Sequence, residues 1–549
     1  MPMTKPTSEQ VTFLAAGSGA SQRTVLDKLR DVVSVKDFGA VGDGVANDAP
    51  AIQDAIDSIS GNAEVVFPPG IYAIGASGVN ITSKNRLTLT GYGAQLKIIS
   101  VSTLPAMPYG GGSVSVRFQS CTSCTIQGFE IDGNSIACNP LGMNQCTDCI
   151  VSEMAVHDSG IMGILTAGGT RTSFLNNHIY DNASVGLYAG NTTANSTDME
   201  DDVLIANNAV LNNGATGIAV SSRGGRVASN RSEGNQGSGI IFPAFLTNVA
   251  KDIACVGNHC TGNLFHGIQS DAFGYVVGNP LPSYISVVGN VCDNNTSGIY
   301  AANVNSWSIN GNVCRDNTNH GITVNGEFFN VSVVGNVCCD TRTGGSRTQL
   351  RGISAIEQSS TVFSNGPLSV GCNVCVNNIY AGIAMSTTNV GYKLTGLSVT
   401  GNTCTGSDYG IICSEFDVGS VSNTIVSGNT LFLNSTQDLR VSAINVVLGD
   451  NMYSTSQDLV YALPNNSATP SVLGRKWWNA TNSSATAITN FVDGRVGQEI
   501  VITATNANTT INNTATILND GGVNLAMPSG GSISYVYTGA VWRMLWKSF

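Results

Sequence analysis

Acidic residues recur at one position of a repeated pattern and are the first candidates for chemistry. The pattern contains a Gly-(Ile/Leu) pair, and Asp271, Glu327, Glu357 and Glu415 follow the glycine of such a pair by four to six residues. Two carboxyl groups about 5 Å apart suit a retaining glycosidase, and about 6.5–9.5 Å suits inversion through water. We predict Asp271, Glu327 and Glu357 as catalytic residues and Glu415 as a substrate-binding residue.

Three arginines lie in the insertion just before Glu357, at Arg342, Arg347 and Arg351. A guanidinium group pairs with a carboxylate or phosphate, and it would also neutralise a uronate before a lyase removes its proton. We predict that the three arginines bind substrate, and a solvated loop or a subunit interface remains the alternative.

Two other sets of polar residues stand out by their type. His157, Asp158 and His178 are acid–base groups, but the pattern around them favours a structural place in an outer strand or turn. The acidic run 198–202 lacks the regular alternation of a known Ca²⁺ loop, so a solvated insertion is favoured. No metal and no cofactor are predicted.

A sequence pattern that recurs along the middle of the chain must position these residues. An Asn-x-(Cys/apolar) element recurs every 22 to 37 residues between Asn177 and Asn429, and the Gly-(Ile/Leu) pair follows it after about nine residues. A period near 22 with short strands predicts one coil of a right-handed parallel β-helix, with coils about 4.8 Å apart. Adjacent coils would then place Glu327 and Glu357 about 5 Å apart, and Asp271 about 10 Å from Glu327 along the axis.

Stacked coils also explain the asparagines and cysteines. We expect each repeated Asn to adopt the left-handed conformation at a turn and to hydrogen-bond the Asn above and below. The cysteines would stack inside as small hydrophobic residues, and disulfides are the alternative. Cys121-x-x-Cys124 and Cys146-x-x-Cys149 resemble a zinc ribbon, but the 25 residues from Cys121 to Cys146 equal one coil. We therefore favour stacked coil residues there.

The two ends of the chain differ from its middle. Residues 24–33 predict a short amphipathic helix, and a second helix follows Asp48, its expected N-cap, with Pro50 in the first turn. That helix would close the open end of the solenoid. After residue 460 alternating strands predict a β-sandwich. It contains four of the five tryptophans, which form either the core with subunit contacts or a carbohydrate-stacking platform: Trp477, Trp478, Trp542 and Trp546.

Composition limits the classes of function. The chain has 549 residues, of which 42% are hydrophobic and only 11% are charged, with 25 Lys+Arg against 36 Asp+Glu. Such a chain can bury a large core, but it has no basic stripe for nucleic acid. No apolar run reaches the length of a membrane span, and no signal peptide pattern opens the chain. The 15 cysteines form an odd number spread over a long chain, unlike a small disulfide scaffold.

Two segments resemble known families. Residues 37–57 together with 66–72 resemble the opening motif of the pectate lyase superfamily β-helix. Residues 23–39 look like tailspike and tail-fibre proteins of tailed bacteriophages, and the tail of the chain resembles C-terminal modules of phage depolymerases. The resemblance implies an all-β fold, a right-handed parallel β-helix with a short N-terminal helical segment and a C-terminal β-sandwich. The expected domains are 1–33 for virion attachment, 34–75 for the capping helix and first strands, 76–460 for the β-helix, and 461–549 for trimerisation or carbohydrate binding.

The resemblance also implies a function. It predicts a homotrimeric tailspike that binds and depolymerises a bacterial surface polysaccharide, capsule or O-antigen, with glycoside hydrolysis favoured over lyase elimination. Its N-terminus would contact a phage tail or baseplate protein, and the protein would be assembled in the cytoplasm of the bacterial host and carried on the virion. A non-catalytic polysaccharide-binding adhesin and a structural tail component remain the alternatives.

Overall fold

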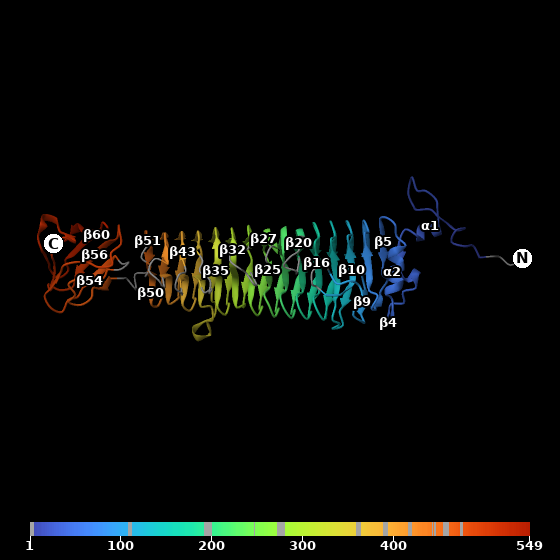
Figure 1. Ribbon diagram of the computed structural model, residues 1–549, viewed down its shortest axis with the longest axis horizontal. Coiled ribbons are helices and arrows are strands. Elements are labelled where there is room, and N and C mark those ends of the chain that lie inside the picture. Colours follow the sequence, from blue (N-terminus) through green and yellow to red (C-terminus); the bar gives the residue numbers. More distant parts are fainter. Residues whose placement is uncertain are drawn as a thin grey trace. The chain divides into compact units, whose positions relative to one another are not determined.

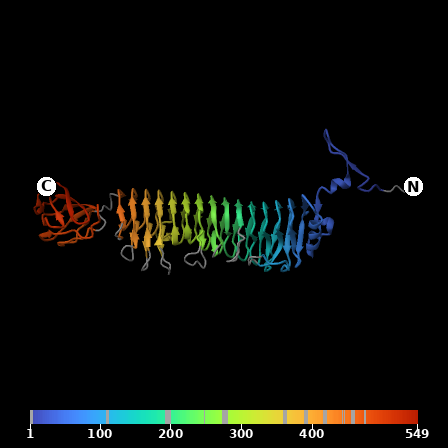
Figure 2. The same ribbon diagram turned by 45° about the horizontal axis from the view of Figure 1, so that its top comes forward.

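The computed structural model describes residues 5–107, 112–190, 200–245, 248–271, 280–357, 364–387, 393–414, 420–441, 443, 446–453, 460–472 and 476–549. The chain divides into two compact units, Met1–Val337 and Cys338–Phe549. Stacked coils of short strands are plain in each unit, with every strand of a coil lying beside its counterpart in the next coil (Figures 1 and 2). The predicted parallel β-helix is confirmed.

In the first unit, the coils contribute their strands to three parallel sheets. The first sheet contains β7 (Val79–Thr82), β10 (Val114–Gln119), β13 (Asn139–Asn144), β16 (Ile164–Ala167), β19 (Leu187–Ala189), β22 (Ile218–Val220), β25 (Ile240–Phe245), β29 (His266–Asp271), β32 (Ser297–Asn305) and β35 (His320–Phe329). A short strand, β26 (Asn248–Val249), pairs with β25.

The second sheet of this unit contains β3 (Val33–Ser34), β5 (Ala63–Val66), β8 (Leu87–Thr90), β11 (Thr125–Gln127), β14 (Ile150–Ser152), β17 (Ser173–Leu175), β20 (Glu200–Ala206), β23 (Ser222–Ala228), β27 (Lys251–Val256), β30 (Ser286–Val288), β33 (Ser308–Asn310) and β36 (Val331–Val334). The third sheet contains β4 (Asp43–Asn47), β6 (Gly70–Ile74), β9 (Ala94–Ile98), β12 (Glu130–Asp132), β15 (Ala155–His157), β18 (His178–Tyr180), β21 (Ala209–Leu211), β24 (Arg231–Glu233), β28 (His259–Thr261), β31 (Val291–Asp293) and β34 (Val313–Arg315).

The N-terminal part of this unit carries the helices. A small hairpin, β1 (Thr12–Phe13) and β2 (Arg23–Thr24), precedes α1 (Val25–Leu29) and the 3₁₀ helix η1 (Val35–Phe38). Helix α2 (Ala49–Asp57) buries Ile52, Ala55 and Ile56, as its apolar spacing predicted. Asp48 occupies the N-cap position, but its side chain does not cap the helix. It instead accepts hydrogen bonds from the backbone N–H groups of Val41, at 2.6 Å, and Ala73, at 3.2 Å, so it ties the helix entry to the first coils.

The second unit begins with the same coil pattern. Its coils comprise β38 (Arg351–Glu357), β42 (Ala381–Thr387), β46 (Tyr409–Ser414) and β50 (Gln437–Val441) in one sheet, β40 (Leu368–Gly371), β44 (Leu397–Thr400), β48 (Thr424–Ser427) and β51 (Val446–Leu448) in the next, and β37 (Val337–Cys339), β41 (Val374–Val376), β45 (Thr403–Thr405), β49 (Thr430–Phe432) and β52 (Met452–Tyr453) in the third. A small sheet pairs β39 (Ser364–Asn365), β43 (Lys393–Thr395) and β47 (Val421–Ser422), and η2 spans Gly344–Ser346.

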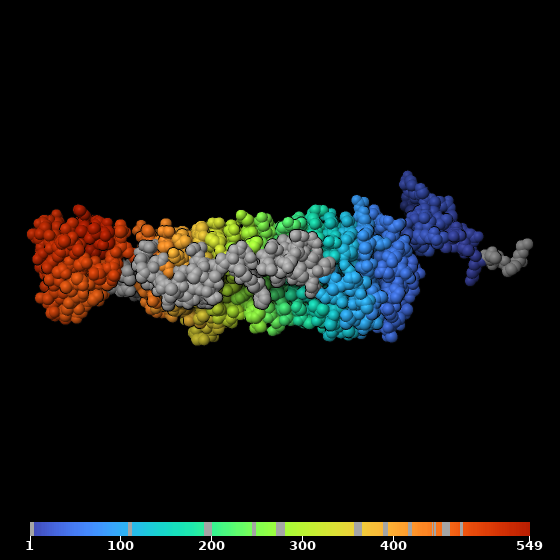
Figure 3. Space-filling view, in the orientation of Figure 1, coloured from blue at the N-terminus to red at the C-terminus, as the bar shows by residue number. Residues whose placement is uncertain are grey.

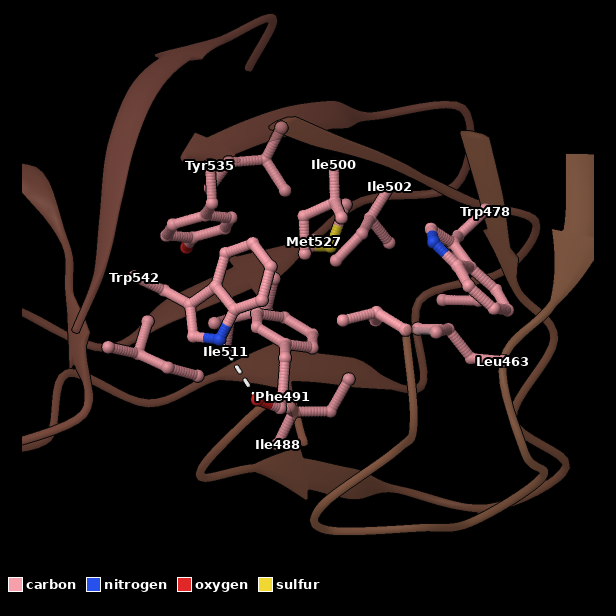
Figure 4. Packing of buried hydrophobic residues seen from close by; sticks show 14 of the residues in the cluster. Leu463, Trp478, Ile488, Phe491, Ile500, Ile502, Ile511, Met527, Tyr535 and Trp542 are labelled. Atoms are coloured by element: carbon pink, nitrogen blue, oxygen red, sulfur yellow. Dashed lines mark hydrogen bonds between the residues drawn. The ribbon is translucent and has the colours of Figure 1, made fainter. Parts of the chain in front are cut away.

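A β-sandwich ends the second unit. One sheet has the order β53 (Val460–Ala462), β54 (Trp477–Ala480), β56 (Glu499–Ala504), β60 (Ser532–Tyr537), β61 (Trp542–Lys547) and β58 (Ile517–Leu518). The other contains β55 (Thr486–Ile488), β57 (Thr509–Ile511) and β59 (Leu525–Met527), and η3 spans Asp520–Gly522. Figure 4 shows the core between them, where the Trp542 indole N–H donates to the Phe491 carbonyl at 2.9 Å.

The tryptophans of the sandwich divide into two groups. Trp478 and Trp542 are 5% and 0% exposed and belong to its core, as the core interpretation predicted. Trp477 and Trp546 are 48% and 41% exposed, so for these two the platform and subunit-contact alternatives both remain open.

Two asparagine ladders join the coils of the first unit. Along the predicted ladder, the backbone N–H and the side-chain amide of each Asn donate to the Oδ1 of the Asn one coil further on, in the order Asn177, Asn208, Asn230, Asn258, Asn290, Asn312 and Asn336. A second ladder, five residues later, was not predicted and runs through Asn182, Asn213, Asn235, Asn263, Asn295 and Asn317. Each buried amide is thereby satisfied.

The expected conformation of the ladder asparagines was wrong by one residue. The residue just before the ladder Asn takes the left-handed conformation, as at Asn176, with φ 57°, and Gly289, with φ 63°. The ladder side chain can then point inward while its predecessor turns the chain. This explains why Gly frequently precedes the repeated Asn.

The cysteines of the repeated element stack inside the coils as predicted, whereas Cys339 is half-buried and Cys372 is exposed. Cys260, Cys292 and Cys314 are register partners in β28, β31 and β34, and all three are fully buried free thiols. The two CxxC pairs also lie in adjacent coils, because Thr122 and Thr147 between them form a parallel bridge. Within the described residues, no helix is long and apolar enough to cross a membrane.

Candidate functional site

The outer surface of β29, β32 and β35 carries a cluster of polar side chains, which we call the polar face: His266, Gln269, Tyr300, Thr323, Asn325 and Glu327. Gln269, Tyr300 and Thr323 are register partners on the three strands. Their neighbours Ile268, Ile299 and Ile322 are fully buried. Because side chains alternate along a strand, the polar residues point away from the coil interior. The space-filling view shows the outer surface of one face of the first unit, coloured from blue at its N-terminal end to yellow (Figure 3).

Two rings lie at the centre of the polar face. His266 and Tyr300 stack nearly parallel, with ring centroids 4.5 Å apart and planes inclined by 6°. Burial lowers the pKa of His266 to about 4, so its imidazole is neutral near pH 7. The hydroxyl of Tyr300 accepts a hydrogen bond from the Asn325 amide at 3.1 Å. The stack therefore presents a neutral ring nitrogen and a positioned phenol on one surface.

Several polar atoms of this face are buried and have no hydrogen-bond partner among the residues that the structure describes. They are Nδ1 of His266, Oγ1 of Thr323 and Oδ1 of Asn325. An unsatisfied buried polar group costs about 1–3 kcal/mol, so three of them on one face require a reason. Hydroxyl groups of a carbohydrate both donate and accept hydrogen bonds, and they would satisfy all three.

A β-bulge aims Glu327. The register between β32 and β35 shifts between Ala302 and Val304, where Gly326 has φ 64°. The backbone N–H of Glu327 donates to Oδ1 of Asn303 at 2.9 Å. Bulges re-aim side chains and are frequent near active sites. The half-buried Glu327 thus lies on the polar face beside Asn325, which precedes it by two residues on the same strand.

The other predicted acids are positioned only in part. Asp271 ends β29, where its backbone pairs with Pro243, and its side chain lies outside the described residues. Asp271 follows Gln269 by two residues, and Asn325 follows Thr323 by two residues. The backbones of Asp271 and Asn325 therefore lie two coils apart, about 10 Å. Glu357 ends β38 in the second unit, and its side chain also lies outside the described residues, as does the whole of Glu415.

The three predicted arginines make contacts within the second unit. Arg342 pairs with the fully buried side chain of Asp340, at 2.8 Å, and Asp340 also accepts from the backbone N–H of Thr348 at 2.7 Å. Arg347 donates to the carbonyl of Gly406 at 3.1 Å. The guanidinium of Arg351 lies 5.1 Å from the centre of the Tyr380 ring, and burial lowers its pKa. Arg342 and Arg347 therefore hold the insertion together.

The acidic run is divided by the structure. Asp198 and Met199 lie outside the described residues, whereas Glu200 is fully buried and accepts hydrogen bonds from Thr166, Thr172 and the Gly169 N–H. Burial raises the pKa of Glu200. A buried carboxylate of this kind packs the interior and is not a solvated loop residue, so the expectation of a solvated insertion was wrong for Glu200.

One group of side chains in the described part of the chain is arranged so that it could hold a metal ion. Ligand atoms of Asp132, His157 and Asp158 lie within 4.8 Å of one another. His157 already bonds Asp158 through Nδ1 at 2.8 Å and Glu130 through Nε2 at 3.2 Å. The structural place expected for His157 is thus supported by its partners.

Five members of the polar face were not predicted from the sequence: His266, Gln269, Tyr300, Thr323 and Asn325. A signal for three of them was present, because the residue directly after each Gly-(Ile/Leu) pair must point outward if the Ile points inward. That rule selects Gln269, Tyr300 and Thr323. No signal in the sequence shows that His266, at the start of its strand, stacks on a residue of the next coil.

Two family models match the chain. Residues 32–262 match the rhamnogalacturonase A/epimerase, pectate lyase-like model. Residues 460–543 match the phage depolymerase C-terminal beta sandwich domain. Each match covers less than half of the chain: the first lies within the parallel β-helix, which is similar to pectate lyase-like proteins, and the second covers the C-terminal β-sandwich, which is similar to that of phage depolymerases.

Individual relatives add detail. The chain is 34% identical over 107 residues to a mannuronan C5-epimerase of Azotobacter vinelandii, and 36% identical over 96 residues to plasmin and fibronectin-binding protein A of Streptococcus pneumoniae. These matches cover 18% and 17% of this chain but only 12% and 13% of the relatives.

Solved structures share the fold. The A-module of an Azotobacter vinelandii mannuronan C-5 epimerase matches with a TM-score of 0.53 and 19% identity, over 71% of this chain and all of the module. A tailspike protein of an Escherichia coli bacteriophage matches with a TM-score of 0.51 and 12% identity, over 80% of this chain and 82% of the tailspike.

Proposed function

We propose that the protein is a phage tailspike that binds and depolymerises a bacterial surface polysaccharide, capsule or O-antigen. The observation that carries this proposal is the polar face, where a carboxylate, a neutral imidazole and a phenol lie together with buried polar atoms that find no partner within the described part of the chain. Convergent polar groups on one surface are the usual mark of a substrate site. The phage depolymerase domain at residues 460–543 supports the same function.

Cleavage by hydrolysis is the reaction that the acids support best. One carboxyl group protonates the glycosidic oxygen, while a carboxylate either attacks the anomeric carbon or activates a water molecule that does so. Glu327 is our candidate for one of these two roles, and Asp271 and Glu357 are the sequence-based candidates for the other. Tyr300 and Thr323 would hold sugar hydroxyls in place, which restricts the substrate to a reactive orientation.

Elimination is the second reaction that the polar face supports. A neutral imidazole such as that of His266 can accept a proton, and a phenol such as that of Tyr300 can donate one. The name of the epimerase relative describes an enzyme that acts on a uronate at C5, which favours this alternative. A lyase would remove the C5 proton, expel the leaving oxygen at C4 and leave a double bond in the product.

Binding without cleavage is the remaining candidate. It is favoured by the similarity to plasmin and fibronectin-binding protein A, whose name describes a binding protein.

Whether the protein cleaves the glycan or only binds it, we propose a homotrimer, carried on the virion and assembled in the host cytoplasm, with residues 1–33 attached to another tail protein. An exposed solenoid with few charges gains stability when three copies bury their faces against one another.

The deciding experiment incubates the protein with the surface polysaccharide of its host and follows the length of the glycan by size-exclusion chromatography. A depolymerase shortens it, and an adhesin binds it without shortening. New ultraviolet absorbance from an unsaturated uronate identifies a lyase, whereas shortening with only a new reducing end identifies a hydrolase. A bound but intact glycan would refute the enzymatic proposal.

A further inference from the structure

A groove on the first unit lies along the third sheet, whereas the polar face lies on the first sheet. It has a volume of about 720 Å³ and follows the turns that enter the third sheet, across the coils of β6, β9, β12, β15 and β18. Much of its floor is made of small residues, including Gly70, Gly93, Gly128 and Ala155. Five successive coils span about 19 Å along the axis. The groove is therefore long enough for several sugar units of an extended glycan.

An exposed aromatic ring borders this groove. The side chain of Tyr92 is held at its far end, because its hydroxyl donates to Oε2 of Glu153 at 2.7 Å, and the residue is still 54% exposed. A Cβ added at Gly128 would lie 2.7 Å from Cδ1 of Tyr92, so the ring rests directly on the glycine backbone. Tyr92 thus crosses from its own coil over Gly128 to Glu153. A ring held in place in this way offers its face to a sugar at little entropic cost.

A fixed hydrogen-bond acceptor, Glu130, also lines the groove. The Glu130 carboxylate receives the Gln95 amide at 2.5 Å and contacts Nε2 of His157 at 3.2 Å. His157 is itself fixed, since it stacks on the Tyr180 ring with centroids 4.7 Å apart and its side chain is only 10% exposed. Glu130 remains 47% exposed. It can therefore accept further hydrogen bonds from hydroxyl groups of a ligand, and such charge-assisted bonds are strong.

The charge of the groove selects the ligand. Glu130 and Glu153 line it, with Asp132 and Asp158 close by, and among the described residues none of these four forms an ion pair with Lys or Arg. The nearest cations on the same sheet are Lys97, the register partner of Asp132, and Arg231, two coils beyond His178. Burial lowers the pKa of His178, which favours its neutral form. A surface of this sign repels uronates and phosphates.

We infer that this groove is a second glycan-binding site, which holds an uncharged or amino-sugar stretch of polysaccharide while the polar face acts on another stretch. The inference rests on the proposed function for the identity of the ligand as a glycan. One coil spacing, about 4.8 Å, is close to the length of one sugar unit, so successive coils can contact successive sugars. Two sites on one protein raise its avidity for a long polymer without a new contact at either site.

The test uses the full-length protein and an array of immobilised bacterial surface polysaccharides that includes neutral, amino-sugar-containing and uronate-containing members. Tyr92→Ala should weaken binding to neutral or amino-sugar glycans at least tenfold, and Gly128→Ala should do so by displacing the ring. The matched controls are Tyr284→Ala, which removes a ring that is 55% exposed elsewhere, and Gly262→Ala, which has a similar φ of 62° and open space around it. Both controls should bind as the wild type does.

Each other result has a definite meaning. Unchanged binding by both groove variants overturns the inference and leaves the proposed function intact. Tyr92-dependent binding of uronate glycans alone overturns the assigned class of ligand. Absence of all glycan binding by the wild type overturns the inference and the proposed function together.

Discussion

The rings of His266 and Tyr300 stack across two coils, with planes only 6° apart. His266 begins β29, whereas Tyr300 lies on β32 opposite Gln269. The contact joins residues 34 positions apart in the chain and places a neutral imidazole beside a phenol on the polar face. Burial of the imidazole lowers its pKa to about 4, and this value leads to a prediction about stability.

The pKa of His266 predicts a loss of stability in acid. The unfolded chain binds a proton at His266 below about pH 6.5, but the folded protein does so only near pH 4. The contribution of this residue is therefore complete above about pH 6.5 and is lost as the pH falls toward 4. The loss is at most about 3 kcal/mol. Thermal unfolding of the wild type and His266→Gln between pH 7 and pH 4 measures it: the stability advantage of the wild type should shrink, and a constant difference would contradict the prediction.

Glu327→Gln should abolish most of the cleavage. The amide has nearly the same shape as the carboxyl group but cannot act as acid, base or nucleophile, so we expect turnover to fall about 100-fold or more with glycan binding retained. Glu233→Gln is the control, because Glu233 pairs with Arg231 on the third sheet. Full activity in Glu327→Gln would remove Glu327 from the catalytic residues.

Gly326→Ala should disturb the bulge that aims Glu327. A Cβ at Gly326 would lie 2.4 Å from Oδ1 of Asn303, the atom that accepts the Glu327 N–H. Gly311→Ala is a matched control, because Gly311 has φ 62° and no atom within 4 Å of its Cβ position. Both variants should lose about 1 kcal/mol from the positive φ, but only Gly326→Ala should lose activity. Equal activity of the two variants would show that the bulge does not position the site.

Trp477 and Trp546 lie on one face of the sandwich. Trp477 is in register with Val501, Val501 with Ser534, and Ser534 with Trp546, so the two indoles flank a four-strand surface opposite the core. If the pair is a sugar platform, Trp477→Ala and Trp546→Ala should each weaken glycan binding without changing the molar mass measured by light scattering. A trimer contact predicts the reverse pattern. An unchanged result in both measurements would exclude both roles.

Much of the solenoid was predictable because stacking repeats the same environment in every coil. The predicted ladder from Asn177 to Asn336 and the buried Cys260, Cys292 and Cys314 follow from that repetition. The second ladder could have been found by the same reasoning, since its asparagines follow the first by five residues. The position of the left-handed residue could not, because Asn176 and Asn177 both suit a tight turn by type and only the backbone path distinguishes them.

The sequence predicted that Glu327 lies at the outer end of a strand. It did not predict most of the other residues of the polar face. Aligning Glu327 with the Gly-(Ile/Leu) pair located the outer end of β35 correctly. Charge suggested the arginines as substrate-binding residues, but charge does not show that Arg342 pairs with the buried side chain of Asp340. Because charged residues are few in this chain, the carboxylates were preferred as candidates over Tyr300 and Thr323. These two residues carry no charge at pH 7, but their surroundings are better defined than those of the carboxylates.

The sequence by itself determined the coil repeat, the inward and outward alternation of its strands and the presence of a different C-terminal module, because each depends on local periodicity and hydrophobicity. The tertiary structure alone decided the stacking of His266 on Tyr300, the aim of Glu327 at its bulge and the groove beside Tyr92. The repeat keeps the coils in register, as at Ile268, Ile299 and Ile322, whatever the lengths of the insertions. No local pattern encodes which outward side chains of neighbouring coils come into contact.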